Sequence, residues 1–161
     1  MTNTSSDINV ALITGASRGL GLALARQLAL QGWRLIIDAR DATALEIARA
    51  ELSQWTQVTA LAGDVTDEKH RLALVDVVKQ SGSLDVLVNN ASMLGPSPQP
   101  QLLEYPPAVL EQVYRTNLLA PLALIQATWP FLRPEGCILN ITSDAGVEAY
   151  PGWGGYGSSK A

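Results

Sequence analysis

Short apolar runs alternate with helical segments from residue 10 almost to the end of the chain. The runs with the length and composition of strands are Val10–Ile13, Arg34–Arg40, Val58–Ala62, Leu84–Val88 and Cys137–Ile141. Helical periodicity separates them, and the segments that show it are Leu22–Ala29, Thr43–Leu52, Glu68–Gln80 and Ala108–Leu132. Nearly all-apolar strands that alternate with helices form a parallel sheet covered on both faces, so the sequence predicts a doubly wound α/β sheet.

Length and composition limit the chain to one domain. It has 161 residues, of which 47% are hydrophobic and 16% charged, which is enough for one sizeable core. We expect a polar tail at residues 1–9 and a single domain at residues 10–161. The formal net charge of -4, without any cluster of Lys and Arg, argues against nucleic acid or an anionic membrane as a partner.

Neither secretion, nor membrane insertion, nor a metal site is expected. No apolar run approaches the roughly 18 residues needed to span a bilayer, and residues 1–9 have no apolar signal core, so the expected compartment is the cytoplasm. The single cysteine, Cys137, lies in an apolar run, which favours a buried core thiol over a nucleophile. One cysteine and one histidine, His70, are too few ligands for a typical metal site built from soft ligands.

A glycine-rich turn follows the first strand. The segment from Thr14 to Gly21 reads Thr-Gly-Ala-Ser-Arg-Gly-Leu-Gly, and a helical pattern follows it. Glycines let the backbone turn tightly and approach a ligand, while free N–H groups at the start of a helix attract a phosphate. A tight turn with no ligand is the plainer alternative, but a strand before the turn and a helix after it are the context that a dinucleotide site requires.

The other candidate binding residues follow the predicted strands. In an open α/β sheet the ligand lies beyond the carboxyl ends of the strands, which here carry Ala39-Arg40, Asp64, Asn90 and Ser143 besides the glycine turn. Each has a structural alternative: Asp64 could cap or turn the chain, Asn89 and Asn90 could form a turn, and Ser143 could bond to nearby backbone.

A tyrosine and a lysine lie four residues apart at the end of the chain, at Tyr156 and Lys160. Residues at this spacing share a face of a helix, so the Lys160 ammonium can lie close to the Tyr156 hydroxyl. A nearby cation favours the phenolate and lowers the tyrosine pKa from about 10, so that the hydroxyl can exchange protons with an alcohol or carbonyl. A solvated surface pair is the alternative.

Together these motifs resemble the short-chain dehydrogenase/reductase family, which joins a Rossmann sheet to a Ser, Tyr, Lys active site with a helical Asn. The resemblance covers the chain after the polar tail. The matching elements, in order, are Thr14-Gly15-x-x-x-Gly19-x-Gly21, Asp64-Val65, Asn89-Asn90-Ala91, Asn117, Ser143 and Tyr156-x-x-x-Lys160. Ser143 precedes Tyr156 by 13 residues, a separation similar to the family's. Ser92 departs from the pattern, because the family usually has glycine there.

The resemblance implies hydride transfer between a nicotinamide and a small-molecule carbonyl or secondary alcohol, with Tyr156 as acid or base. The implied catalytic residues are Asn117, Ser143, Tyr156 and Lys160. The implied cofactor-binding residues are Gly15, Ser17, Arg18, Gly19, Leu20, Gly21, Arg40, Asp64, Val65, Asn90, Ala91, Tyr156 and Lys160. A dinucleotide-binding sensor or scaffold without turnover is the alternative function, although a pure binder needs no activated phenol.

The sequence favours NADP(H) over NAD(H), which remains an alternative. Ala39 stands 18 residues after Gly21, where NAD-preferring members of the family tend to carry an acid. Arg40 follows it, and Arg18 lies in the glycine turn, so two guanidiniums can pair with a 2′-phosphate. Asp38 should point to the opposite face of its strand from Ala39, although a one-residue error in register would favour NAD.

Three further expectations concern the active-site region. Pro121 has no N–H to donate to the Asn117 carbonyl, so the long helix should kink there. The resemblance implies that Asn117 holds a water in a proton relay to Lys160. Tyr150 and Trp153 are candidate walls of the substrate site, with ordinary loop packing as the alternative.

The chain as written is expected to be an incomplete enzyme, because members of the family ordinarily continue beyond the Tyr-Lys motif. Helices shorter than roughly 12 residues are marginal without packing, so the pair Tyr156 and Lys160 would be held loosely. The strand Cys137–Ile141 would lack its usual neighbour and form an exposed edge. We expect residues 1–161 alone to bind cofactor weakly and to show no useful turnover. The full-length protein is expected to be a homo-oligomer, a dimer or tetramer, in which the long helix supplies part of the contact.

Overall fold

The computed structural model describes residues 8–161, so the polar tail expected at residues 1–9 lies mostly outside the described residues. Five parallel strands form one sheet in the order β3-β2-β1-β4-β5. The strands are β1 (Val10–Ile13), β2 (Arg34–Ala39), β3 (Val58–Ala62), β4 (Leu84–Asn89) and β5 (Leu132–Asn140). The strand order reverses between β1 and β4, which opens a crevice at the carboxyl ends of these two strands. The predicted doubly wound, Rossmann-type sheet is confirmed.

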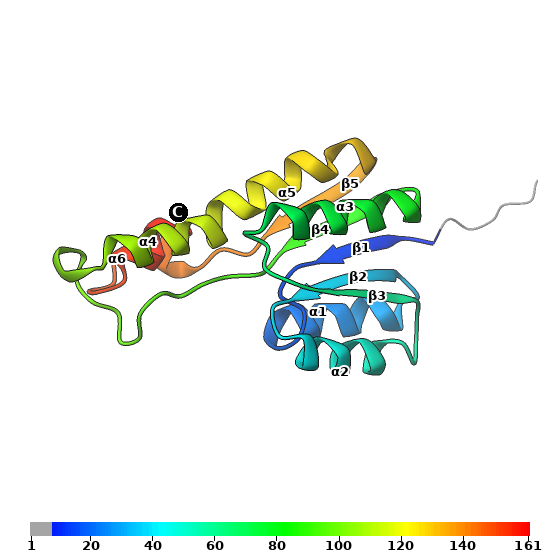
Figure 1. Cartoon of the computed structure of the whole chain (residues 1–161), viewed down its shortest axis with the longest axis horizontal. Helices are drawn as coiled ribbons and strands as arrows, with labels where there is room; N and C mark the ends of the chain where they lie inside the picture. The colour runs from blue at the N-terminus through cyan, green and yellow to red at the C-terminus, as the bar shows by residue number, and fades with distance from the viewer. Residues whose placement is uncertain (1–7) are drawn as a thin grey trace, which may run out of the picture.

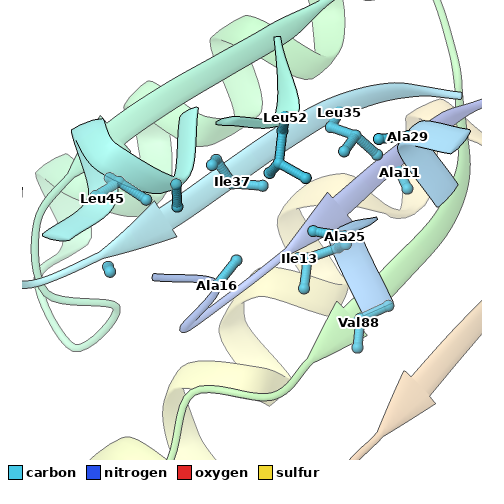
Figure 2. Close-up of a cluster of buried hydrophobic side chains, with 12 residues drawn as sticks. Ala11, Ile13, Ala16, Ala25, Ala29, Leu35, Ile37, Leu45, Leu52 and Val88 are labelled. Carbon is cyan, nitrogen blue, oxygen red and sulfur yellow. The ribbon is translucent and has the colours of Figure 1, made fainter. Parts of the chain in front are cut away.

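Helices cover both faces of the sheet (Figure 1). The helices α1 (Gly19–Leu30) and α2 (Ala42–Leu52) pack on one face, and the helices α3 (Glu68–Ser81) and α5 (Ala120–Thr128) pack on the other. Ala25 and Ala29 on α1 are almost fully buried, and their small side chains bring this helix close to β1 and β2 (Figure 2). Asp41 and Asp67 begin α2 and α3, since each carboxylate accepts a backbone N–H of the first turn.

The long helix expected at Ala108–Leu132 is interrupted. It consists of α4 (Pro107–Tyr114), a π-helical segment η2 (Arg115–Leu119) and α5. The N–H of Ala120 donates to the carbonyl of Arg115, one residue further back than in an α-helix, just before Pro121. The α-helical hydrogen-bond pattern is therefore interrupted next to Pro121 by a π-bulge, a feature that commonly accompanies the kink expected here.

The boundary between this helix and the last strand was predicted wrongly. The α-helix ends at Thr128, a short 3-10 turn η3 (Trp129–Phe131) follows, and β5 begins at Leu132 instead of Cys137. The reason is Pro130, which cannot continue an α-helix because it lacks the N–H and crowds the preceding turn.

Cys137 was expected to be buried, and the structure corrects this: its thiol is exposed. Among the described residues, β5 pairs with β4 alone and forms the outer strand of the sheet, as expected for Cys137–Ile141. The outward-facing side chains of an edge strand have fewer neighbours, and Leu139 of β5 is also 45% exposed. Among residues 8–161, no helix combines the length and the apolar character needed to cross a membrane.

Candidate active site

The glycine turn between β1 and α1 lies against the end of β4. Gly15 has a φ of 66°, a left-handed conformation that glycine adopts without strain. A side chain would not fit at this turn: a Cβ on Gly21 would lie 2.5 Å from Asn90 Nδ2 and 2.6 Å from the Gly15 carbonyl. Gly15 and Gly21 are therefore required by the close approach of the two segments.

Asn90 and Thr14 hold the glycine turn in place. The Asn90 Nδ2 donates to the carbonyls of Thr14 at 2.9 Å and Gly15 at 3.1 Å. The backbone N–H groups of Asn90 and Ala91 both donate to Thr14 Oγ1 at 3.0 Å. The Asn90 side chain, which was predicted to bind cofactor, thus also shapes the turn that would receive a phosphate.

A pocket of about 380 Å³ opens beyond the carboxyl ends of β1, β2 and β3. The residues predicted to bind cofactor that line it are Gly15, Ser17, Arg18, Arg40, Asp64, Val65, Asn90 and Ala91. The predicted residues that do not line it are Gly19, Leu20, Gly21, Tyr156 and Lys160. The pocket wall also contains residues that were not predicted to bind cofactor, namely Asp38, Asp41, Ala44, Gly63, Ser92 and Thr116. The position of Gly63 directly after β3 is a signal that could have identified it.

The α1 helix begins at this pocket with free backbone donors. Arg18 is its N-cap and makes no side-chain capping hydrogen bond. The first N–H groups of a helix are unsatisfied and favour an anion. Arg18 and Arg40 add two guanidiniums to the same pocket. The pocket therefore suits a ligand that carries phosphate groups.

Asp64 both turns the chain after β3 and lines the pocket. Its Oδ1 accepts from the Thr66 N–H at 2.9 Å and from the Thr66 hydroxyl at 2.8 Å. Burial by itself raises the pKa of the Asp64 carboxyl, but these hydrogen bonds and the charges of Arg40 and His70 outweigh it, so the pKa lies below its usual range. The carboxylate is therefore ionised at neutral pH.

Asp38 is buried near the end of β2, and its side chain takes part in two hydrogen bonds. Its Oδ1 accepts from the Gly15 N–H at 2.8 Å, and its Oδ2 lies 2.9 Å from His70 Nε2 on α3. Ala39 belongs to the core on the opposite face, with α1 and α2. The predicted orientation of Asp38 away from Ala39 is thus confirmed.

The Tyr-Lys pair lies on the short helix α6 (Gly154–Ser158) and the turn after it. The Lys160 ammonium lies 5.9 Å from the centre of the Tyr156 ring, and its Nζ donates to the Ile141 carbonyl at 2.8 Å. Burial lowers the pKa of the Lys160 ammonium. The cation is therefore anchored to the end of β5 and faces the tyrosine ring.

Ser143 lies on the turn that packs against α6. It begins the 3-10 turn η4 (Asp144–Gly146), where its hydroxyl donates to Asp144 Oδ1 at 3.0 Å and accepts from the Ala145 N–H at 3.3 Å. A Cβ on Gly157 would lie 2.3 Å from the Ala145 carbonyl oxygen, so the turn and α6 are in direct contact. The Ser143 turn and the Tyr156 helix thus form one packed unit.

Asn117, on the π-helical segment, joins this unit to the loop after β4. Its Nδ2 donates to the Met93 carbonyl at 2.9 Å and to Ser159 Oγ at 2.8 Å. Its Oδ1 accepts from the Met93 N–H at 2.7 Å and from the Ser92 hydroxyl at 3.3 Å. Ser92, which departs from the family's glycine, thus adds a donor to Asn117.

Tyr150 and Trp153, the predicted substrate walls, occupy the segment between η4 and α6. The Trp153 ring meets the Tyr156 ring edge-on, with centroids 6.0 Å apart. The Tyr150 hydroxyl donates to Glu148 Oε2 at 2.9 Å, and both residues are exposed. Of these two aromatic residues, Trp153 is therefore the one whose ring contacts Tyr156.

Two cavities meet at Ala91. The pocket at the glycine turn includes Ala91 and Thr116, and a second cavity of about 240 Å³ includes Ala91, Asn117 and Lys160. The structure therefore gathers the predicted residues into two groups, a phosphate-compatible pocket and a Tyr-Lys unit, joined along the end of β4.

Comparison with known proteins agrees with this geometry. The family model for short chain dehydrogenase matches residues 9–161. The chain is 34% identical, over 155 residues, to the uncharacterized oxidoreductase YxjF of Bacillus subtilis (strain 168), covering 94% of this chain and 59% of that protein. The chain therefore spans little more than half the length of this relative.

Two solved structures share the fold. One is a NAD+-bound xylitol dehydrogenase, with a TM-score of 0.88 and 31% identity over 94% of this chain and 59% of that one. The other is a metagenomic short-chain oxidoreductase in complex with NADP, with a TM-score of 0.86 and 33% identity over 94% of this chain and 69% of that one. The fold is thus similar to proteins solved with either nicotinamide dinucleotide.

Proposed function

This chain belongs to the short chain dehydrogenase family, and from that premise we propose that the protein is an oxidoreductase that transfers a hydride between NADP(H) and a carbonyl or secondary alcohol. In this proposal the pocket at the glycine turn holds the dinucleotide, and Tyr156 acts as the general acid or base. The observation that carries it is the position of the Lys160 ammonium, which is anchored to the Ile141 carbonyl and faces the Tyr156 ring.

The proposed cofactor preference rests on the charges of the pocket. Arg18 and Arg40 both line it, and a guanidinium pairs well with a phosphate through two parallel hydrogen bonds. Ala39 offers no carboxylate to the ribose, and the Asp38 carboxylate is already hydrogen-bonded on both oxygens. These features support NADP(H) over NAD(H).

The protein's own part in the reaction is to handle the proton and to position the substrate oxygen. The nicotinamide supplies or accepts the hydride when it is bound. Tyr156 donates a proton to the carbonyl oxygen in reduction and takes it back in oxidation. Lys160 stabilises the phenolate that remains after donation. The Ser143 hydroxyl, which now donates to Asp144, turns to donate to the substrate oxygen.

The same proposal gives Asn117 an indirect role. Its side chain holds Ser159, and the Ser159 hydroxyl donates to the Tyr156 carbonyl at 2.7 Å. Asn117 therefore fixes the position of α6 relative to the loop after β4. Positioning of this kind raises the rate because the reacting groups are already aligned.

The test is turnover of the full-length gene product with NADPH and a broad panel of carbonyls, for wild type and Tyr156→Phe. We expect Tyr156→Phe to keep dinucleotide binding and to lose about 10²- to 10⁴-fold in kcat. The matched control is Tyr114→Phe, because Tyr114 is a half-buried residue on α4 that lines neither cavity. Near-normal turnover of Tyr156→Phe would contradict the assignment. Dinucleotide binding without turnover by wild type on any carbonyl would favour a sensor or scaffold.

Assembly is proposed on a separate observation. Leu118 and Leu122 lie one helical turn apart and are 47% and 49% exposed, next to Leu119 at 52%. Exposed leucines grouped on one helix are typical of a contact between subunits. We propose that this helix contributes to a homo-oligomer, and a mass by light scattering equal to that of one chain would contradict it.

A further inference from the structure

A buried carboxylate lies in the floor of the proposed nucleotide pocket. Asp38 lines the pocket beside Ala39 and Arg40, yet only 1% of its surface is exposed. A negative charge at this place repels a 2′-phosphate. It is also one residue from the position at which an acid binds the ribose hydroxyls in NAD sites. Something must therefore counter this carboxylate if the protein is to prefer NADP(H).

His70 meets the free oxygen of that carboxylate. The Gly15 N–H occupies Oδ1, and His70 Nε2 lies 2.9 Å from Oδ2. His70 comes from the first turn of α3 and is itself only 8% exposed. An ionised carboxylate can only accept, so in a pair with the Asp38 carboxylate the His70 Nε2 is the donor. Both oxygens of Asp38 thus already have a hydrogen-bond partner within the protein.

The position of His70 depends on a glycine at the end of β3. A Cβ on Gly63 would lie 2.2 Å from His70 Nδ1 and 2.5 Å from its Cγ. The imidazole therefore packs directly against Gly63, where a side chain on any other residue would displace it. Gly63 also lines the nucleotide pocket, so the histidine is placed directly behind the pocket wall.

We infer that His70 is a specificity-determining residue, which secures the preference for NADP(H) by holding the Asp38 carboxylate away from the ribose. The inference rests on the proposed function, since it concerns the dinucleotide pocket of that function. With His70 in place, Arg18 and Arg40 determine the preference, because they favour the ribose that carries a 2′-phosphate. Without it, the Asp38 Oδ2 loses its donor and becomes available to the 2′- and 3′-hydroxyls of NAD(H), while its charge opposes a 2′-phosphate.

A purely structural role for His70 makes a different prediction. If His70 only fixed α3 to β2 or supported the glycine turn through Asp38, its loss would weaken NADPH and NADH binding equally. The ratio of the two affinities distinguishes the roles, because loss of folded protein lowers both affinities together and leaves the ratio unchanged.

The experiment is titration of the full-length gene product with NADPH and with NADH, followed by the fluorescence of the reduced nicotinamide. The variants are His70→Leu and His70→Gln. The leucine removes the hydrogen-bond donor to Asp38, whereas the amide N–H of glutamine can reach the position of Nε2 and keep a donor there. We expect His70→Leu to lower the ratio of NADPH to NADH affinity about tenfold, and His70→Gln to retain most of the wild-type ratio. His70→Asn, which is too short to reach Asp38, must shift the ratio as His70→Leu does, and it replaces that variant if leucine prevents folding.

The decisive test is to repeat the His70→Leu substitution in a protein that already carries Asp38→Asn. It keeps an oxygen for the Gly15 N–H but removes the charge, so we expect it to keep the preference for NADPH. In this background His70→Leu should leave the ratio unchanged, because there is no carboxylate left to release. Such non-additivity is the signature of two residues that act through one contact.

Two results would overturn the inference: an unchanged ratio of the two affinities in His70→Leu, which includes an equal loss of both, or the same shift in the presence of Asp38→Asn. Wild-type preference for NADH would overturn it as well, together with the proposed preference for NADP(H). These outcomes leave the proposed dinucleotide site intact. Wild-type protein that binds neither dinucleotide would instead contradict the proposed function, and the inference with it.

Discussion

Replacing Asn117 with alanine should destabilise the protein, because this buried side chain joins three segments. The Nδ2 and Oδ1 atoms bond to both backbone groups of Met93 and to Ser159 on the α6 segment, with the Ser92 hydroxyl as a longer fourth contact. Asn117 is 8% exposed, so water replaces it poorly.

The loss of stability depends on which partners of Asn117 are left without a hydrogen bond. Ser159 keeps a hydrogen bond to the Tyr156 carbonyl, and the Ser92 contact is long at 3.3 Å, so these two contribute least. The two Met93 groups lose their partner outright, at about 1–3 kcal/mol for an unsatisfied buried group and less where solvent reaches it. We expect Asn117→Ala to lose about 2–4 kcal/mol, a large share of the roughly 5–15 kcal/mol typical of a domain.

The assay is urea denaturation of the full-length gene product followed by circular dichroism, with Gln112→Ala as the control because Gln112 is exposed on α4. The control should change the free energy of unfolding by no more than about 0.5 kcal/mol. A loss below about 1 kcal/mol for Asn117→Ala would refute the reasoning, since it would mean that the loop after β4 and α6 do not depend on this side chain.

Three further variants test other parts of the structure. Gly21→Ala places a Cβ 2.5 Å from Asn90 Nδ2, so we expect at least tenfold weaker NADPH binding in a fluorescence titration, and unchanged binding would contradict the close approach. Tyr105→Phe should leave the melting temperature unchanged or raise it, because the Tyr105 hydroxyl is buried without a hydrogen-bond partner among residues 8–161; a clear fall would reveal a missed partner. The pKa of Asp64 is lowered in the fold, so its carboxylate stabilises the protein above about pH 4 and loses this effect as the pH falls through its folded value. Asp64→Asn should therefore reduce the dependence of stability on pH at the acidic end, and an unchanged acid titration would count against the Thr66 hydrogen bonds.

Most of the fold could be predicted from local patterns. The strands Val10–Ile13 and Val58–Ala62 begin and end where the sequence analysis placed them, because each is a short apolar run bounded by polar or glycine-containing turns. Parallel strands are buried on both faces, so their apolar runs are continuous and easily recognised. The helices α2 and α3 begin after aspartates that accept N–H groups of the first turn, and these too are local signals.

The errors occurred where tertiary context decides the structure. Cys137 has an apolar sequence environment, and only its position on the outer strand leaves it exposed. The helix before it ends four residues earlier than predicted, at Thr128, because the apolar residues up to Leu132 continue the pattern beyond the point at which Pro130 stops the helix. Periodicity reports which face is apolar, and it does not report which faces the fold will cover.

Part of the candidate pocket could be predicted, because residues such as Gly15, Arg40 and Asn90 closely follow strands. The contacts within the site could not be predicted, since they join positions far apart in the sequence. Asp38 and His70 are 32 residues apart and Asn117 and Ser159 are 42 apart, and no local pattern relates either pair. Their pairing depends on how α3 and the π-helical segment lie against the sheet, which the sequence pattern does not specify.

The motif residues are of two kinds that cannot be distinguished from the sequence: some hold segments of the fold together, and Tyr156 does not. Asn90, Asn117 and Lys160 each bond to backbone of another segment, so their loss should lower stability and activity together. The Tyr156 hydroxyl has no hydrogen-bond partner among residues 8–161, so its removal breaks no contact in this part of the chain. A loss of activity in a variant of the first group is therefore no evidence of a chemical role by itself. Of these four residues, only Tyr156 should give a variant, Tyr156→Phe, that lowers kcat while the free energy of unfolding stays within about 0.5 kcal/mol of wild type. That combination of results identifies the acid or base.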